Sequence, residues 1–188
     1  MKPLSLLTRS VLATAVISLT ACASVQKTTS EQTTLSNTDK AVAVISSIET
    51  GDAKAISYIN PTQYTQHNLA VKDGLAGFGE VLQQLPKGSA KAQVKRAFSD
   101  GNYTVTHTEY NFFGPKVGFD IFKFENGKII EHWDNLQAIT PVNPSGRTQL
   151  DGATAITDLS KTKANKALVK GFVNTILING DMAKINDS

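Results

Sequence analysis

The sequence predicts an α+β domain in which helices come first and one curved antiparallel sheet follows. Apolar residues recur at helical spacing over roughly residues 39–85, whereas residues 90–139 are rich in β-branched and aromatic residues that alternate with polar ones. Asp100-Gly101 and Asn126-Gly127 separate the β-rich runs, and such dipeptides are typical of hairpin turns. A sheet wrapped around a helical layer favours a small-molecule pocket between the two.

Three helices are predicted before the sheet. The first runs from about Asp39 to Glu49, and Asp52 caps a short second helix. Asn60-Pro61 ends that helix, and an extended or single-turn segment, Tyr64 to Asn68, follows it. Asp73 then caps a third helix that stops at Pro86.

Four strands are predicted: Ala90–Ser99, Asn102–Phe112, Lys116–Glu125 and Lys128–Ile139. Alternation along the last strand puts His132 and Asp134 on one face. With a two-residue loop at Asn126-Gly127, Asp120 lies opposite Trp133 and away from Asp134. With a type I turn and Gly127 as a bulge, Asp120 lies opposite His132, on the same face. We favour the bulged turn because it brings the three acid–base side chains together.

Residues 1–21 resemble a lipoprotein signal peptide. Lys2 and Arg9 precede a mostly apolar run, Val11–Leu19, which is too short to span a bilayer as a helix. Leu19-Thr20-Ala21-Cys22 resembles a bacterial lipobox, which implies cleavage before Cys22 and a lipid anchor on that residue. Because Ala23 follows, the resemblance implies a cell-envelope protein on the outer membrane, facing the periplasm. The alternative is an ordinary secretory signal followed by an incidental cysteine.

Residues 22–38 are rich in Ser, Thr, Gln and Lys and are predicted to form a flexible tether. Of the 19 basic residues, Lys2 and Arg9 fall in the signal segment, which leaves 17 against 16 acidic ones. This balance, with no basic cluster, argues against a nucleic-acid partner. Cys22 is the only cysteine, so the sequence predicts neither an intrachain disulfide nor a thiolate metal cluster.

Residues 158–188 are predicted to form C-terminal helices after the domain at 39–150. One helix covers Lys163–Ile178, and another starts at Met182. The segment at 165–168 echoes residues 39–42, and the segment at 180–185 echoes residues 51–56. We interpret this as the start of a truncated second repeat. The alternative is a helix pair that docks on the single domain.

Several short motifs of the domain together resemble those of SnoaL-like proteins, the polyketide-cyclase relatives within the nuclear transport factor 2-like superfamily. These motifs are Tyr64-Thr65-Gln66-His67-Asn68, Asp120-Ile121-Phe122-Lys123, Glu125-Asn126-Gly127 and Glu131-His132-Trp133-Asp134. The resemblance implies a cone-shaped barrel, made of a curved antiparallel sheet packed on the N-terminal helices, and homodimers formed through the sheet face. It also implies that Asp134 matches the aspartate that drives an intramolecular aldol condensation in the cyclases. The cyclases have a histidine where this chain has Asp120.

The predicted catalytic residues are Asp134, His132 and Asp120. An apolar pocket favours the neutral form of a carboxyl group, which suits Asp134 to act as a general base. A carboxylate beside His132 would fix the tautomer of its ring. The residues expected to bind the substrate are Tyr64, His67, Asn68, His107 and Phe122. No His-x-His or His-x-x-x-His spacing occurs, and neither a metal nor another cofactor is expected.

Two functional hypotheses follow from these patterns. The first is an envelope lipoprotein that binds a small apolar molecule and carries out cofactor-free acid–base catalysis of the aldol, isomerase or lyase type. The second is a non-catalytic ligand-binding or assembly module that uses the same pocket. Catalysis predicts that Asp134 and His132 point into a closed hollow. Binding or assembly predicts that these groups are exposed or already hydrogen-bonded.

Overall fold

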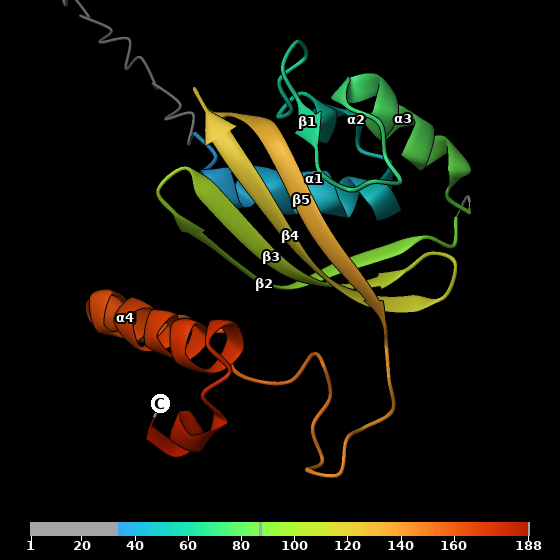
Figure 1. The fold of residues 1–188 in the computed structure, drawn as a ribbon. Helices are drawn as coiled ribbons and strands as arrows, with labels where there is room; N and C mark the ends of the chain where they lie inside the picture. The colour runs from blue at the N-terminus through green and yellow to red at the C-terminus, as the bar shows by residue number, and fades with distance from the viewer. Residues whose placement is uncertain (1–33, 87, 188) are drawn as a thin grey trace, which may run out of the picture. The chain divides into compact units, whose positions relative to one another are not determined.

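A five-stranded sheet forms the centre of the fold (Figure 1). The computed structural model describes residues 34–86 and 88–187, so the predicted signal peptide, Cys22 and most of the tether lie outside the described residues. The strands are β1 (Thr65–Gln66), β2 (Lys91–Asp100), β3 (Tyr103–Asn111), β4 (Pro115–Glu125) and β5 (Lys128–Ala138). Their order is β1-β5-β4-β3-β2, and all neighbours are antiparallel except β1 and β5, which run parallel.

Three helices precede the long strands: α1 (Asn37–Thr50), α2 (Ala53–Ile56) and α3 (Gly74–Gln84). Helix α1 begins earlier than predicted because Ser36 caps it. The Ser36 hydroxyl accepts a hydrogen bond from the backbone N–H of Asp39, whose carboxylate accepts one from the backbone N–H of Ser36. Gly51 ends the helix in the left-handed conformation that glycine adopts most easily.

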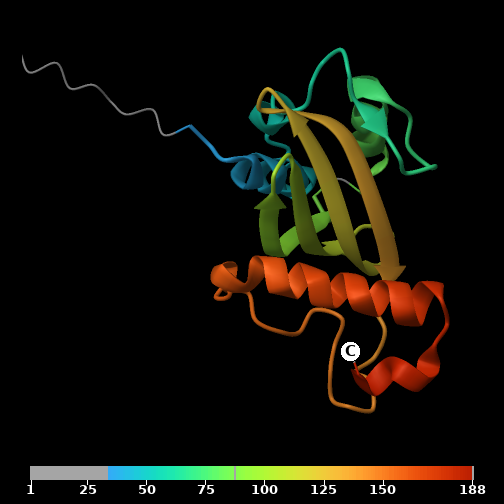
Figure 2. The same ribbon diagram turned by 60° about the vertical axis from the view of Figure 1, so that its left-hand side comes forward.

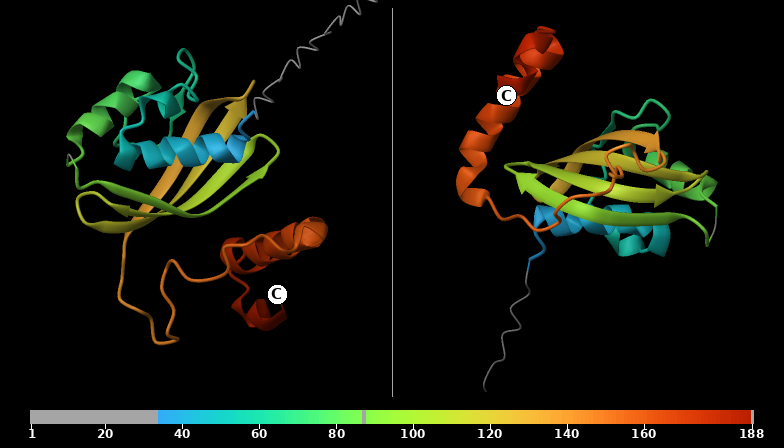
Figure 3. Two further views of the ribbon diagram at one scale, coloured as in Figure 1. Left: turned by 180° about the vertical axis from the view of Figure 1, so that it is seen from behind. Right: turned by 90° about the horizontal axis from the view of Figure 1, so that it is seen from below.

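The core lies between the helices and the concave face of the sheet, which α1 crosses when the molecule is seen from behind (Figure 3, left). Helix α1 contributes Ala41, Val44 and Ile45, all at most 3% exposed. The other buried apolar members are Ala55, Ile59, Tyr64, Ala92, Tyr110, Phe122, Phe124 and Ile129. Helices first and a curved sheet around them make this an α+β fold, so the predicted fold class is confirmed.

The hairpin between β4 and β5 differs from the favoured prediction in its turn. Glu125 pairs with Lys128 around a two-residue loop in which Asn126 and Gly127 both have positive φ, so the bulged turn is wrong. The extra residue lies further along β5, at Ile130, where the register shifts. Asp120 consequently pairs with Asp134, not with His132 or Trp133, and the three acid–base residues still share the concave face.

The C-terminal segment forms one continuous helical rod followed by a short helix (Figure 2). Helix α4 (Thr162–Phe172) continues as the π-helical η2 (Val173–Ile178), and the 3₁₀ segment η3 (Met182–Asp187) follows. These bounds agree closely with the predicted helices. Whether the segment begins a second repeat stays a prediction.

No helix among the described residues combines the length and apolar character needed to cross a bilayer.

Two glycines of α3 give a matched test of its packing. A Cβ on Gly77 would lie 1.9 Å from the backbone oxygen of Lys72, whereas a Cβ on Gly79 would meet nothing within 4 Å. We expect Gly77→Ala to lower the free energy of unfolding by about 2–3 kcal/mol, because a backbone atom must move. Gly79→Ala should raise it by about 1 kcal/mol, because alanine favours the helix. Urea unfolding followed by circular dichroism measures both, and equal effects would contradict this packing.

Candidate functional site

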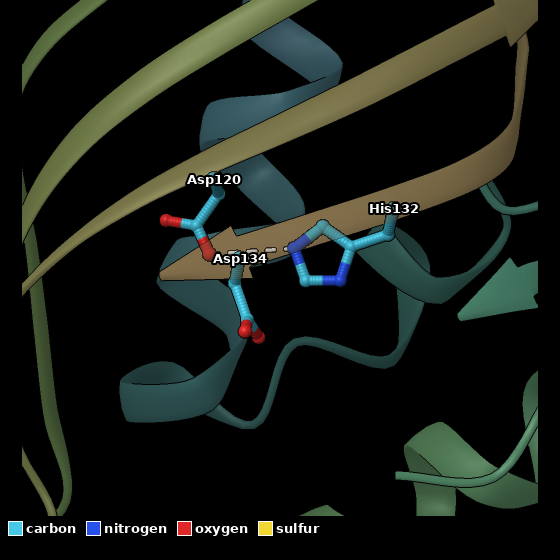
Figure 4. Close-up of side chains that lie close together, drawn as sticks. All are labelled: Asp120, His132 and Asp134. Carbon is cyan, nitrogen blue, oxygen red and sulfur yellow. Dashed lines mark hydrogen bonds and ion pairs between the residues drawn. The ribbon is translucent and has the colours of Figure 1, made fainter. Parts of the chain in front are cut away.

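Asp120 is a buried carboxyl group with several hydrogen-bond donors around it. It is 2% exposed and projects from the middle of β4. The hydroxyls of Tyr110 and Thr106, both on the neighbouring strand β3, donate to its Oδ2 at 2.7 and 3.1 Å. The ring Nε2 of His132 lies 3.3 Å from its Oδ1 (Figure 4). The donors therefore satisfy a carboxylate that the surrounding core would otherwise disfavour.

The tautomer of His132 follows from Gln66, which lies beside it as its pairing partner in the parallel ladder of β1 and β5. The Gln66 Oε1 accepts a hydrogen bond from the backbone N–H of Asn68, so its Nε2 is the donor facing His132 Nδ1 at 2.9 Å. The Nδ1 atom must then be the acceptor, and the ring proton sits on Nε2, where it is donated to Asp120. The geometry holds a neutral imidazole in one tautomer.

Asp134 is less enclosed than its two neighbours. The side-chain Nδ2 of Asn68 donates to both of its carboxylate oxygens, at 2.8 and 2.9 Å. Figure 4 shows the Asp134 carboxyl group directed away from the contact between Asp120 and His132. A carboxylate has about four acceptor positions, so the single amide group leaves acceptor capacity on Asp134, which is half-buried.

The three side chains are close enough together to suggest a metal site, but their hydrogen bonds do not fit one. One ligand atom from each of Asp120, His132 and Asp134 lies within 4.8 Å of the others. A metal would need a ring nitrogen with a free lone pair. The Gln66 amide occupies the lone pair of Nδ1, and Nε2 carries the proton. The cluster is therefore better suited to proton transfer than to metal binding.

The structure brings only some of the predicted substrate-binding residues to this cluster. Asn68 joins it directly, Tyr64 accepts a 3.4 Å hydrogen bond from Gln66, and the Phe122 ring stacks on the ring of His132. His67 does not join, since it stacks on Trp133 and bonds to Glu131, residues of β5 whose side chains alternate with those of the cluster. His107 pairs with Phe119 between β3 and β4 and also faces away.

The cavity of about 150 Å³ that the structure shows lies on the opposite, convex face of the sheet. Its lining residues are Arg96, Ala97, Phe98, Val105, His107, Phe119 and residues 153–156. Arg96 builds one wall by donating to the carbonyls of residues 150, 151, 152 and 153 and to His107 Nδ1. Burial and, after it, the charge of Arg96 lower the pKa of His107. The backbone carbonyl of Gln149 acts in the opposite direction and raises this pKa. The lowered pKa favours the neutral form of His107, which lies on the other face of the sheet from the cluster.

Sequence reasoning missed three members of the site: Gln66, Thr106 and Tyr110. Gln66 lies within the Tyr64-Thr65-Gln66-His67-Asn68 motif, but the parallel pairing of β1 with β5 is needed to place it next to His132. Thr106 and Tyr110 alternate on β3, and the predicted hairpin pairing of β3 with β4 was a usable signal. Thr106 pairs directly with Asp120.

Two buried tyrosines of the site predict how stability depends on alkaline pH. Burial raises the pKa of the hydroxyls of Tyr64 and Tyr110 far above the usual value, and the negative charge of Asp120 raises both further. In the unfolded chain these phenols ionise near pH 10. Their stabilising contribution is complete below that pH and is lost as the pH rises, by up to about 1.4 kcal/mol per pH unit for each tyrosine. Urea unfolding above pH 10 measures this loss. The free energy of unfolding should fall less steeply with pH in Tyr64→Phe than in the wild type.

Solved structures similar to this chain include an NTF2-like protein of unknown function from Cytophaga hutchinsonii, 15% identical, with a TM-score of 0.48 over 56% of this chain and 94% of that one. IdmH, a proposed polyketide cyclase from Streptomyces antibioticus, is 16% identical, with a TM-score of 0.45 over 54% and 92%. A proposed ketosteroid isomerase from Kribbella flavida is 15% identical, with a TM-score of 0.48 over 65% and 92%. No protein-family model and no curated protein sequence matches the chain.

Proposed function

We propose that this chain is a cofactor-free acid–base catalyst that acts on a small, largely apolar carbon acid. Asp134 is the general base, and the reaction is an aldol condensation, an isomerisation or a lyase-type cleavage. Proton removal next to a carbonyl requires a carboxylate that keeps an open acceptor position within a weakly hydrated site. The lipid anchor on Cys22, and an envelope location with it, belong to the proposal and rest on the sequence pattern of residues 1–22 alone.

The observation that carries the proposal is the contrast between two neighbouring aspartates. Asp120 is 2% exposed and accepts hydrogen bonds from three side chains, whereas Asp134 is half-buried and, among the described residues, accepts from one amide group. Asp120 therefore serves to hold His132 in place, and Asp134 is the carboxylate that can take a proton. Asn68 orients it, since both carboxylate oxygens contact the same Nδ2 atom.

A specific observation also favours a second candidate, a non-catalytic binding module. His132 and both aspartates already have hydrogen-bond partners within the chain, and the 150 Å³ cavity lies on the other face of the sheet. A ligand that binds without reacting would leave this network intact. The two candidates differ in whether the Asp134 carboxylate is needed for turnover.

The experiment follows the isomerisation of 3-cyclohexen-1-one, a β,γ-unsaturated ketone, to its conjugated isomer by ultraviolet absorbance, with cleavage of 4-hydroxy-4-phenylbutan-2-one as a second reaction. We expect measurable turnover by the wild type in at least one of them. Asp134→Asn should reduce kcat by about 100-fold or more, as expected for loss of a general base. The amide keeps the size of the side chain, so the fold should remain.

The matched control is Asp158→Asn, which removes an exposed carboxylate whose one charged neighbour in the described part of the chain is Lys161, at 3.9 Å. It should react at the wild-type rate. Absence of turnover in the wild type for both compounds, or an equal rate in Asp134→Asn and the wild type, would rule out the catalytic proposal.

A further inference from the structure

Helix α4 and its extension η2 carry basic residues along one side and apolar residues along the other. Lys163, Lys166 and Lys170 recur at i, i+3 and i+7, so they form a row along the helix. Leu168 and Phe172 recur at i and i+4 on the opposite side. Between Leu159 and Gly180 the sequence contains no acidic residue. This segment is a basic amphipathic helix.

The apolar side of this helix is largely uncovered. Leu168 and Val169 are each 60% exposed, and Phe172 is 36% exposed. Leu177, Ile178 and Met182 at the same end of the chain are more than half exposed. An amphipathic helix of a globular domain ordinarily packs its apolar stripe on the core. Here only Ile176 of the helix is buried.

The charge of the helix indicates what covers this side. Lys166 pairs with Asp100 at 2.5 Å, and Lys161 approaches Asp158 at 3.9 Å. Within the part of the chain that the structure describes, neither Lys163 nor Lys170 forms an ion pair. The helix therefore carries net positive charge on the side opposite its exposed apolar side chains. Its partner should combine an apolar interior with a negative surface.

We propose that α4 and η2 bind an anionic phospholipid surface and lie in its interface, with Leu168, Val169 and Phe172 entering the acyl boundary. Low overall hydrophobicity with strongly separated apolar and basic sides is the pattern of interfacial helices. A helix is about 10–12 Å wide, close to the screening length at physiological salt, so the long lysine side chains still reach the field of the headgroups. This inference goes beyond the proposed function and does not depend on it.

A second copy of the chain is the other occupant worth comparing. The sheet exposes Phe98, Tyr103 and Phe119, which offer an apolar surface for such a helix. Of the acidic residues near this surface, Glu109, Glu131 and Asp100 already pair with Lys95, Lys123 and Lys166. Among the described residues this leaves Glu125, at the end of β4, as the one acidic side chain of that surface without an ion pair. A lipid surface fits the helix better.

The test places a polarity-sensitive fluorophore on the helix in the full chain. Cys22→Ser removes the only cysteine and prevents lipidation, and Val169→Cys then gives a unique attachment site. The label reports on the helix itself, whether or not the N-terminal residues also attach the chain to vesicles. We expect a blue shift on vesicles that contain phosphatidylglycerol and none on pure phosphatidylcholine. The same label at Leu69→Cys, a fully exposed loop position, should not shift.

Charge reversal supplies the second arm. The double variant Lys163→Glu and Lys170→Glu should need roughly 25-fold more vesicle lipid to reach half of the fluorescence blue shift. Each lysine near an anionic leaflet strengthens membrane binding about fivefold. Lys54→Glu with Arg147→Glu changes the net charge equally away from the helix and should shift as the parent does. No shift on anionic vesicles, or equal shifts on both vesicle types, overturns the proposal. A shift that grows with protein concentration without vesicles also overturns it and assigns the face to a second copy.

Discussion

Asp120→Ala should lower the free energy of unfolding by about 3–5 kcal/mol, although the side chain belongs to a candidate catalytic cluster. Its removal leaves the hydroxyls of Tyr110 and Thr106 and the Nε2–H of His132 without their acceptor in the core. Each buried donor that loses its partner costs about 1–3 kcal/mol. Relief from burying a carboxylate offsets part of that loss. Urea unfolding at neutral pH measures the difference.

Two companion variants separate the network from the mere loss of a charge. Asp120→Asn should cost less than Asp120→Ala, because the hydroxyls of Thr106 and Tyr110 can rotate to accept from the new amide group. Asp158→Ala removes an exposed carboxylate and should change stability by less than about 0.5 kcal/mol. A small effect for Asp120→Ala, similar to that of Asp158→Ala, would mean that the buried network does not stabilise the fold.

Gln66→Glu should convert the ring of His132 from a neutral imidazole into an imidazolium. The backbone N–H of Asn68 still anchors one side-chain oxygen of residue 66, so the other oxygen replaces the amide donor that faces Nδ1. An acceptor at that position requires a proton on Nδ1, while the proton on Nε2 stays with Asp120. Both nitrogens then carry protons, and the two carboxylates stabilise the positive charge.

Nitrogen-15 resonances of the histidine ring report this change directly. In the wild type the two signals should differ strongly, as expected for one protonated and one bare nitrogen. In Gln66→Glu they should move together near the protonated position. Gln63→Glu adds the same charge to an exposed neighbouring position and should leave the His132 signals unchanged. Two similar signals in the wild type would contradict the tautomer that the hydrogen bonds indicate.

Much of the fold could be predicted from the sequence because its elements depend on local signals. Apolar spacing and caps place α1, α2 and α3, and turn dipeptides separate the long strands within one or two residues of their observed ends. The β-bulge at Ile130 could not be predicted, because no turn residue marks it. Ile129 and Ile130 are both buried, and the sequence shows them only as two adjacent apolar residues of a strand.

The site was predictable only where it lies within one hairpin. His132, Asp134 and Asp120 come from adjacent strands, so alternation and pairing are sufficient to place them on one face. His67 and His107 were expected beside them because histidine chemistry suits a pocket, but strand alternation turns both to the other side. Gln66 needs a parallel pairing between segments far apart in the chain, which no local pattern reveals.

The extra residue at Ile130 decides which face of the sheet each later residue of β5 points to. If β5 kept all its residues but paired without the bulge, with the turn left intact, Asp120 would lie opposite Trp133, and His132 and Asp134 would turn to the other face of the sheet. A related chain that is one residue shorter between the turn and the His-Trp-Asp motif would therefore need no bulge to place the same side chains on the same face. In any such comparison, the number of residues between the turn and the motif must be considered together with the presence of the bulge.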